Sequence, residues 1–146
     1  MPTVAVDRPW HLVPVALLAL IWHAGGALDY LLTQINYDPY VSQVPAEWLT
    51  YFNDMPLWVT AAWAIGAWGG LAGALLLLMR EHWAPLLLAV AFFAVAAATV
   101  WLTLFAQPPM QQAVGIEFTW VMIGATLLAL LLWLYARWMR RLGVIT

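Results

Sequence analysis

Long apolar stretches alternate with short polar segments along this chain, and their lengths indicate the architecture. Four stretches, at residues 12–32, 56–79, 84–106 and 118–136, contain at most one charged residue each. A helix needs about 20 mainly apolar residues to cross a bilayer. We therefore predict an all-α fold, a single transmembrane domain over residues 1–146 whose four helices form an up-down bundle. The first stretch follows Arg8 and contains small residues, as a signal peptide does, but we predict a retained helix.

The polar connections differ in length. The turn at residues 80–83 is so short that the helices on either side must be antiparallel neighbours. The first connection is longer, and Pro45 precedes Trp48, Leu49 and Phe52 at helical spacing. This pattern predicts a short interfacial helix over about residues 45–53, with an irregular aromatic-rich loop as the alternative.

Composition supports a membrane protein and excludes several functions. Only 8% of the residues are charged, against roughly 25% in soluble domains. The chain lacks the basic patch that nucleic-acid binding requires. Without cysteine or lysine it has no thiolate site, disulfide or Schiff-base chemistry. We find no catalytic constellation and predict that the protein is not an enzyme.

Charge distribution indicates an orientation. All positive side chains fall on one side of the predicted bundle: Arg8, Arg80, Arg137, Arg140 and Arg141. The connections on the other side carry acids only: Asp38, Glu47, Asp54 and Glu117. Because arginine is enriched on the cytoplasmic side of membrane proteins, both termini should be cytoplasmic.

Tryptophan is abundant, with 11 residues. Trp48 and Trp58 fall near predicted membrane boundaries, where an indole ring sits well among lipid headgroups. Trp22 and Trp63 lie deeper, where the indole N–H needs a hydrogen-bond partner. We expect these two to face other helices or a bound ligand.

Small residues recur along the second stretch. Ala62, Gly66, Gly70 and Ala74 are spaced by four, and Gly73 belongs to a second such spacing. This pattern lets helix backbones approach closely in lipid. The partner is either the first helix or another protein subunit, for which Gly66, Gly70, Gly73 and Trp63 are candidate contacts.

The first stretch also holds an ionisable residue, Asp29, about one turn from its outer end. Such a residue is a functional candidate by default. It is either a rim carboxylate that is hydrated or bonded to Tyr or Trp donors, a contact to a partner subunit, or a protonated acid on an ion path.

His23 is the second chemical candidate, because imidazole can ligate haem iron or chlorophyll magnesium. His11 and His82 lie at the opposite boundary, roughly 18 Å away along a helix, which argues against a two-histidine haem. His23, with Trp22 beside it, is therefore either a pigment ligand or a histidine hydrogen-bonded between helices. No cofactor is assigned; a lipid, a carotenoid or a bacteriochlorophyll are the candidates.

A set of residues in the first half of the chain carries a resemblance to known proteins: Asp29-Tyr30, Thr33, Tyr40, Phe52, Pro56, Trp58-Val59, Ala62-Trp63-Ala64, Trp68-Gly69-Gly70, Gly73, and the leucine run before Arg80. With these residues the chain resembles the small four-helix bacterial inner-membrane proteins labelled "sugar transporter", for which no activity is established. The resemblance implies the four-helix architecture, a multi-pass location in the inner membrane and importance of the first two helices.

Two functions remain open. The first is a non-catalytic accessory subunit that packs against a larger energy-converting complex, respiratory or photosynthetic, with lipids and other membrane subunits as partners. The alternative is a small oligomeric transporter of a solute such as a sugar. Membrane transport paths are usually lined by polar groups, and the apolar stretches offer mainly threonines.

The predicted orientation is testable with reporter fusions. A reporter at Thr146 should give a cytoplasmic signal and one at Tyr51 an external signal, because the arginine bias places these residues on opposite sides. Matching signals from the two fusions would contradict the four-helix topology.

Overall fold

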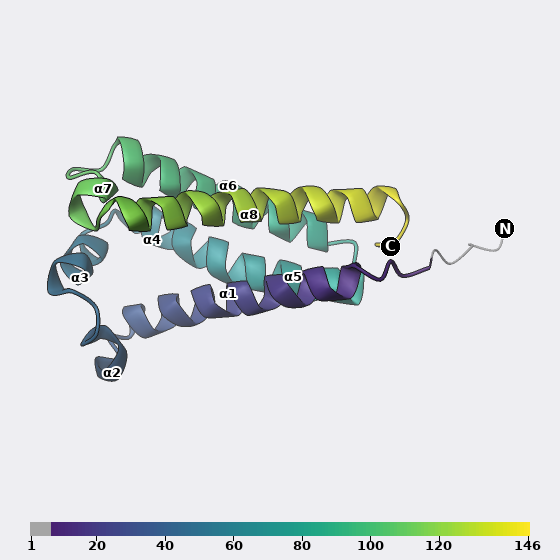
Figure 1. Ribbon diagram of the computed structural model, residues 1–146, viewed down its shortest axis with the longest axis horizontal. Helices are drawn as coiled ribbons and strands as arrows, with labels where there is room; N and C mark the ends of the chain where they lie inside the picture. The colour runs from purple at the N-terminus through teal and green to yellow at the C-terminus, as the bar shows by residue number, and fades with distance from the viewer. Residues whose placement is uncertain (1–6) are drawn as a thin grey trace.

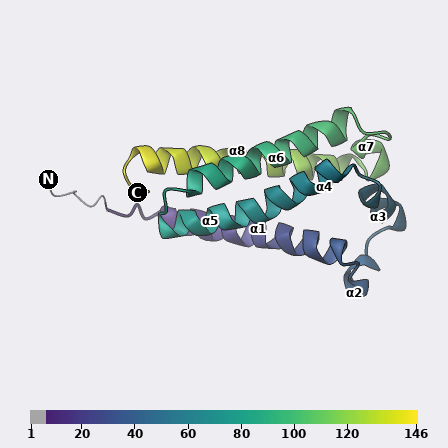
Figure 2. The same cartoon turned by 180° about the vertical axis from the view of Figure 1, so that it is seen from behind.

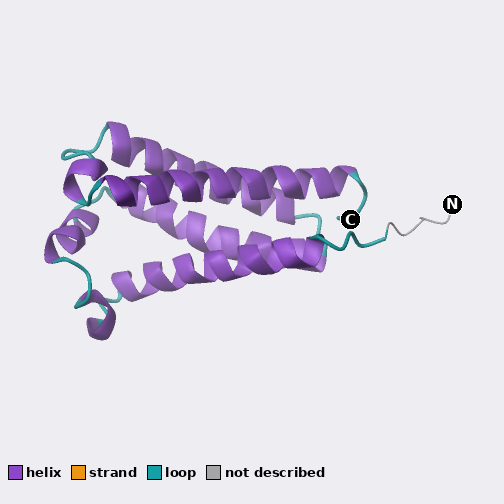
Figure 3. Cartoon of the chain, in the orientation of Figure 1, coloured by secondary structure: helices purple, strands orange, loops and turns teal. Residues whose placement is uncertain are grey.

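A computed structural model describes residues 7–146, and all regular structure in this range is helical (Figures 1 and 3). The first six residues of the predicted domain lie outside the described residues. The helices run alternately up and down, so the prediction of an all-α up-down bundle is confirmed. Both ends of the described chain lie at one end of the bundle, which we call the terminal end; the opposite end is the loop end (Figure 1).

Four helical rods are long and apolar enough to span a membrane. The first is α1 (Leu12–Gln34), and the second is continuous through α4 (Leu57–Ala64), the π-helical turn η1 (Ile65–Gly69) and α5 (Gly70–Met79). The third is α6 (Ala84–Leu104) and the fourth is α8 (Ile116–Arg141). The predicted ranges agree to within two residues, except that α8 ends five residues later, because its helix continues through the terminal arginines.

Three short helices lie at the loop end: α2 (Asp38–Val41), α3 (Ala46–Asn53) and α7 (Met110–Ala113). The α3 helix coincides with the interfacial helix predicted over residues 45–53. The other two, each of four residues, were not predicted from the sequence.

The four rods pack as a sequence of neighbours. The α1 helix lies along α5, the rod of η1 and α5 lies against α6, and α6 lies against α8. Toward the loop end α1 diverges from α4, as both views show (Figures 1 and 2).

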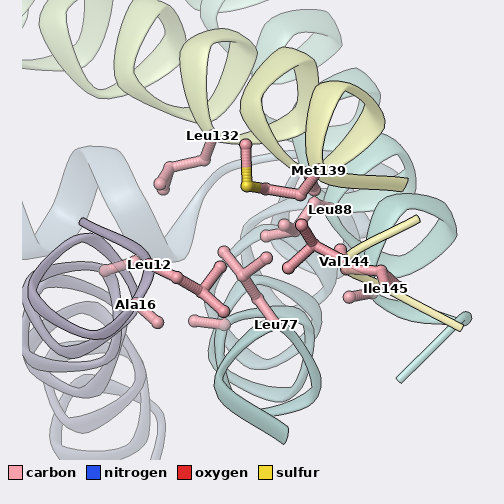
Figure 4. Close-up of a cluster of buried hydrophobic side chains, with 12 residues drawn as sticks. Leu12, Ala16, Leu77, Leu88, Leu132, Met139, Val144 and Ile145 are labelled. Carbon is pink, nitrogen blue, oxygen red and sulfur yellow. The ribbon is translucent and has the colours of Figure 1, made fainter. Parts of the chain in front are cut away.

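All four rods contribute to one core cluster at the terminal end (Figure 4). Its buried members are Leu12, Ala16, Ala19, Ala74, Leu77, Ala84, Leu88, Leu132, Ala136, Met139, Val144 and Ile145.

Val144 and Ile145 belong to the C-terminal tail, which folds back over the α5–α6 turn. Arg80 Nε donates to the Val144 carbonyl at 2.6 Å, and the Thr146 amide donates to the Arg80 carbonyl at 3.2 Å. A 2.6 Å hydrogen bond between His11 Nδ1 and the Tyr135 hydroxyl joins the start of α1 to α8. The bundle is therefore closed at this end.

A second cluster forms the core of the loop end and is built around Val59, Leu102 and Met110, with α3 packed against it. A row of aromatic rings crosses it from α1 to α8. The centroid distances are 5.1 Å for Tyr30–Trp63, 6.2 Å for Trp63–Phe52, 5.8 Å for Phe52–Phe118 and 5.7 Å for Phe118–Trp48. These rings link α1, α3, α4 and α8 at the end where α1 diverges from α4.

Candidate functional site

The second rod uses glycines on two faces. A Cβ atom on Gly73 would lie 2.8 Å from Leu88 Cγ, and one on Gly66 would lie 3.5 Å from Val95 Cβ, so both glycines face α6. A Cβ atom on Gly70 would lie only 2.2 Å from His23 Cε1 and Nδ1, so Gly70 faces α1. The small residues of this rod therefore serve two neighbours. All three glycines are buried inside this chain, and their contact with another subunit stays a prediction.

A π-helical turn, η1, interrupts the α-helical spacing of these small residues. A π turn closes its hydrogen bonds over five residues instead of four and shifts the phase of the residues that follow. Gly66 lies inside this turn, and Gly70 is the first residue after it. Residues that are four positions apart in the sequence therefore do not all face the same side of this rod.

His23 fills the space that Gly70 leaves. The side chain is 7% exposed and lies near the middle of α1. Its Nε2 atom is buried and, among the described residues, has no hydrogen-bond partner. The atom that would ligate haem iron or chlorophyll magnesium is thus covered by the chain itself, and a role of His23 as a ligand stays a prediction. The neighbouring Trp22 is half exposed and does not share this buried position.

Asp29 accepts a hydrogen bond from the Tyr40 hydroxyl, which joins α1 to α2. This contact matches the alternative in which a tyrosine donor satisfies the carboxylate. The hydrogen bond, burial and the negative charge of Asp29 together raise the pKa of Tyr40 to about 12. Tyr40 is therefore neutral and can donate throughout the physiological range.

The predicted tryptophan sites lie in different environments. Trp48 and Trp63 are partly buried in the aromatic row at the loop end. Trp58 is 47% exposed and its ring meets Trp101 edge-on at 5.7 Å. Trp58 therefore keeps the exposed position expected of a boundary residue, whereas Trp48 is used to hold α3 against the bundle.

Threonines between α6 and α8 form a local hydrogen-bonded group. Thr126 Oγ1 donates to the Met122 carbonyl at 2.9 Å, so Thr99 donates to Thr126, also at 2.9 Å. Thr103 donates to the Thr99 carbonyl at 2.7 Å. The Thr103 and Thr126 hydroxyls thus donate to carbonyls of their own helices. The Thr99–Thr126 hydrogen bond joins α6 to α8.

A hollow at the loop end was not predicted. It has a volume of about 330 Å³ and lies between one face of α3 and the segment that joins α6 to α7. Glu47, Tyr51 and Asp54 line it from α3, and Trp101 lines it from α6. The spacing of Glu47, Tyr51 and Asp54 at i, i+4 and i+7 was a visible sign that they share a helix face, but the sequence did not show what lies opposite.

No protein-family model, curated protein or solved structure matches this chain. The resemblance to the four-helix bacterial proteins therefore stays a prediction. Within residues 7–146 no three acidic, histidine or cysteine side chains gather as a metal site would require.

The contact between His23 and Gly70 predicts a coupled pair. Gly70→Ala should destabilise the bundle by about 1–3 kcal/mol, because the new methyl group overlaps the imidazole ring. In a His23→Ala background the same change should cost much less, because the ring is gone. The measurement is the free energy of unfolding in neutral detergent, followed by circular dichroism.

Gly124→Ala is the matched control, since Gly124 lies on α8 with nothing within 4 Å of its Cβ position. It should change stability by no more than about 0.5 kcal/mol. An equal cost of Gly70→Ala with and without the His23 ring would show that the two residues do not press on each other.

The contact between Asp29 and Tyr40 predicts a pH dependence. Since the folded pKa of Tyr40 is raised from 10.0 to about 12, the hydrogen bond contributes fully below pH 10 and is lost as the pH rises through about 12. Asp29→Ala should return the Tyr40 pKa toward 10. The phenolate absorbance would be titrated, with Tyr40→Phe as the reference spectrum. An unchanged titration in the Asp29→Ala variant would refute the contact.

Proposed function

We propose that this chain is a non-catalytic accessory subunit that packs against a larger energy-converting membrane complex, respiratory or photosynthetic, in a bacterial inner membrane. The observation that carries the proposal is the placement of two tryptophans. Trp22 lies midway along α1, and Trp68 lies midway along the second rod. They are 47% and 45% exposed, respectively.

Tryptophan is suited to the membrane boundary, where its ring is in apolar surroundings and its N–H reaches water. Midway along a spanning helix, an indole N–H at the surface would meet hydrocarbon instead of water, and an unsatisfied polar group is costly there. A neighbouring membrane protein can supply both an acceptor for the N–H and a surface for the ring. Buried tryptophans are also enriched where protein interfaces carry most of their binding energy.

The packing of the bundle supports this proposal over transport by a single chain. The His23 ring occupies the space beside Gly70 near mid-span, and Leu88 occupies the space beside Gly73 nearer the terminal end. The threonine hydroxyls between α6 and α8 are hydrogen-bonded to their own helices and to each other. Packed and hydrogen-bonded side chains at these positions support a packing role over a solute path through a single chain.

Co-purification tests the proposal. The tagged chain, extracted in a mild detergent, should bring partner subunits with it in native mass spectrometry. Trp22→Ala and Trp68→Ala should each lower the recovery of partners by about 30-fold, which corresponds to the loss of about 2 kcal/mol at an interface.

Trp83→Ala is the control, because Trp83 is 55% exposed but lies at the terminal end, just before α6. It should leave partner recovery unchanged. A monodisperse lone monomer from the unaltered chain would refute the proposal, as would solute uptake into proteoliposomes that contain this chain alone.

A further inference from the structure

The hollow at the loop end has an acidic, aromatic lining. Glu47 and Asp54 stand at either end of the α3 face that borders it, with Tyr51 between them. Ala106 and Pro108 lie across from this face, and Trp101 adds an aromatic wall. At about 330 Å³ the hollow is within the size range of small-ligand sites.

The negative charges of Glu47 and Asp54 have no arginine to balance them at the loop end. The five arginines of the chain are carried by the N-terminal segment, the α5–α6 turn and the last turns of α8, all at the terminal end. One spanning helix of 21 residues separates the two ends, about 30 Å at 1.5 Å per residue. This separation is several times the Debye length of about 8 Å at physiological salt. Glu47 and Asp54 therefore favour a cation that comes from outside the chain.

Tyr51 lies between the two acids in the lining of the hollow. Its hydroxyl is buried and, within the described part of the chain, has no hydrogen-bond partner. Burial raises the pKa of Tyr51 above 10.0, so the hydroxyl is neutral at physiological pH. The aromatic faces of Tyr51 and Trp101 suit an ammonium group, which aromatic rings attract through their quadrupole.

Trp101 also lines an apolar groove on α6. The groove has a volume of about 460 Å³ and is lined by the small side chains of Ala96 and Ala97 and by the larger rings of Phe93, Phe105 and Trp58. The distance from Phe93 to Phe105 is 12 residues along α6, or about 18 Å. This face belongs to a span that contacts lipid, and its shape and apolar lining suit a hydrocarbon chain.

We propose that the acidic hollow and the apolar groove form one site, which binds an amphiphile with an ammonium headgroup. The ammonium group lies between Glu47 and Asp54 against Trp101. The hydrocarbon chain lies along Ala96 and Ala97 in the groove. A purely apolar occupant would leave the carboxylates unused, and an anionic headgroup would be repelled by them.

The experiment uses the isolated chain in a neutral maltoside detergent, so it is independent of any partner subunit. Octyltrimethylammonium is the probe, tetramethylammonium tests the headgroup alone, and octyl sulfate tests the same chain with an anionic headgroup. Calorimetry should show that octyltrimethylammonium binds at least about tenfold more tightly than either of the others.

Variants separate the two halves of the site. Glu47→Gln with Asp54→Asn should weaken octyltrimethylammonium binding about tenfold and abolish the preference for the cationic headgroup. Ala97→Leu, which fills the groove, should weaken octyltrimethylammonium binding to a similar degree and leave tetramethylammonium binding unchanged. Circular dichroism would confirm that each variant keeps its helical content.

The matched control is Asp38→Asn with Glu117→Gln, because both acids are exposed at the loop end and neither lines the hollow. This control should bind all three probes as the unaltered chain does. Equal binding of the cationic and anionic octyl probes would overturn the proposal. An equal loss in the control variant would overturn it too, since general surface charge would then explain the binding.

Discussion

The structure depends on how closely the second rod approaches its two neighbours. In lipid, burying apolar surface between helices gives little net free energy, so close van der Waals contact must hold the helices together. Gly66 and Gly73 allow this contact with α6, and Gly70 allows it with α1. The second rod is held on both sides, by α1 and by α6, and α8 is added to the bundle by packing on α6. The divergence of α1 toward the loop end follows, since α1 has its close contact only along η1 and α5.

The sequence predicted the four spans well because the thickness of a bilayer determines how long an apolar helix must be. Pro45 and the helical spacing of the aromatic residues after it were likewise sufficient to predict α3. The π-helical turn was not predictable in this way. It lies between α1 and α6, so its surroundings involve residues far apart in sequence, and a π turn has no short sequence signature of the kind that proline gives α3. The four-residue helices α2 and α7 were missed because a single turn is too short to show a hydrophobic period.

The sequence identified the candidate site residues one by one, whereas only the folded structure shows which of them contact each other. His23 and Gly70 both stood out in the sequence, yet 47 positions separate them, and nothing local indicates that one fills the space left by the other. Asp29 was easier, since a tyrosine donor was among its expected partners and Tyr40 is only 11 residues away. The hollow was missed because Glu47 and Asp54 look like ordinary solvated acids until α3 packs them near Trp101.

The separation of charges along the bundle links these features. With every arginine at the terminal end, an acid at the loop end has no cation of this chain within reach and must use a neutral donor, water or an external cation. Asp29 takes the neutral donor that α2 brings to it. Glu47 and Asp54 instead stand on one exposed face of α3, beside an aromatic wall. The charge asymmetry from which the membrane orientation was predicted thus also creates, at the opposite end, an acidic surface with no arginine of this chain beside it.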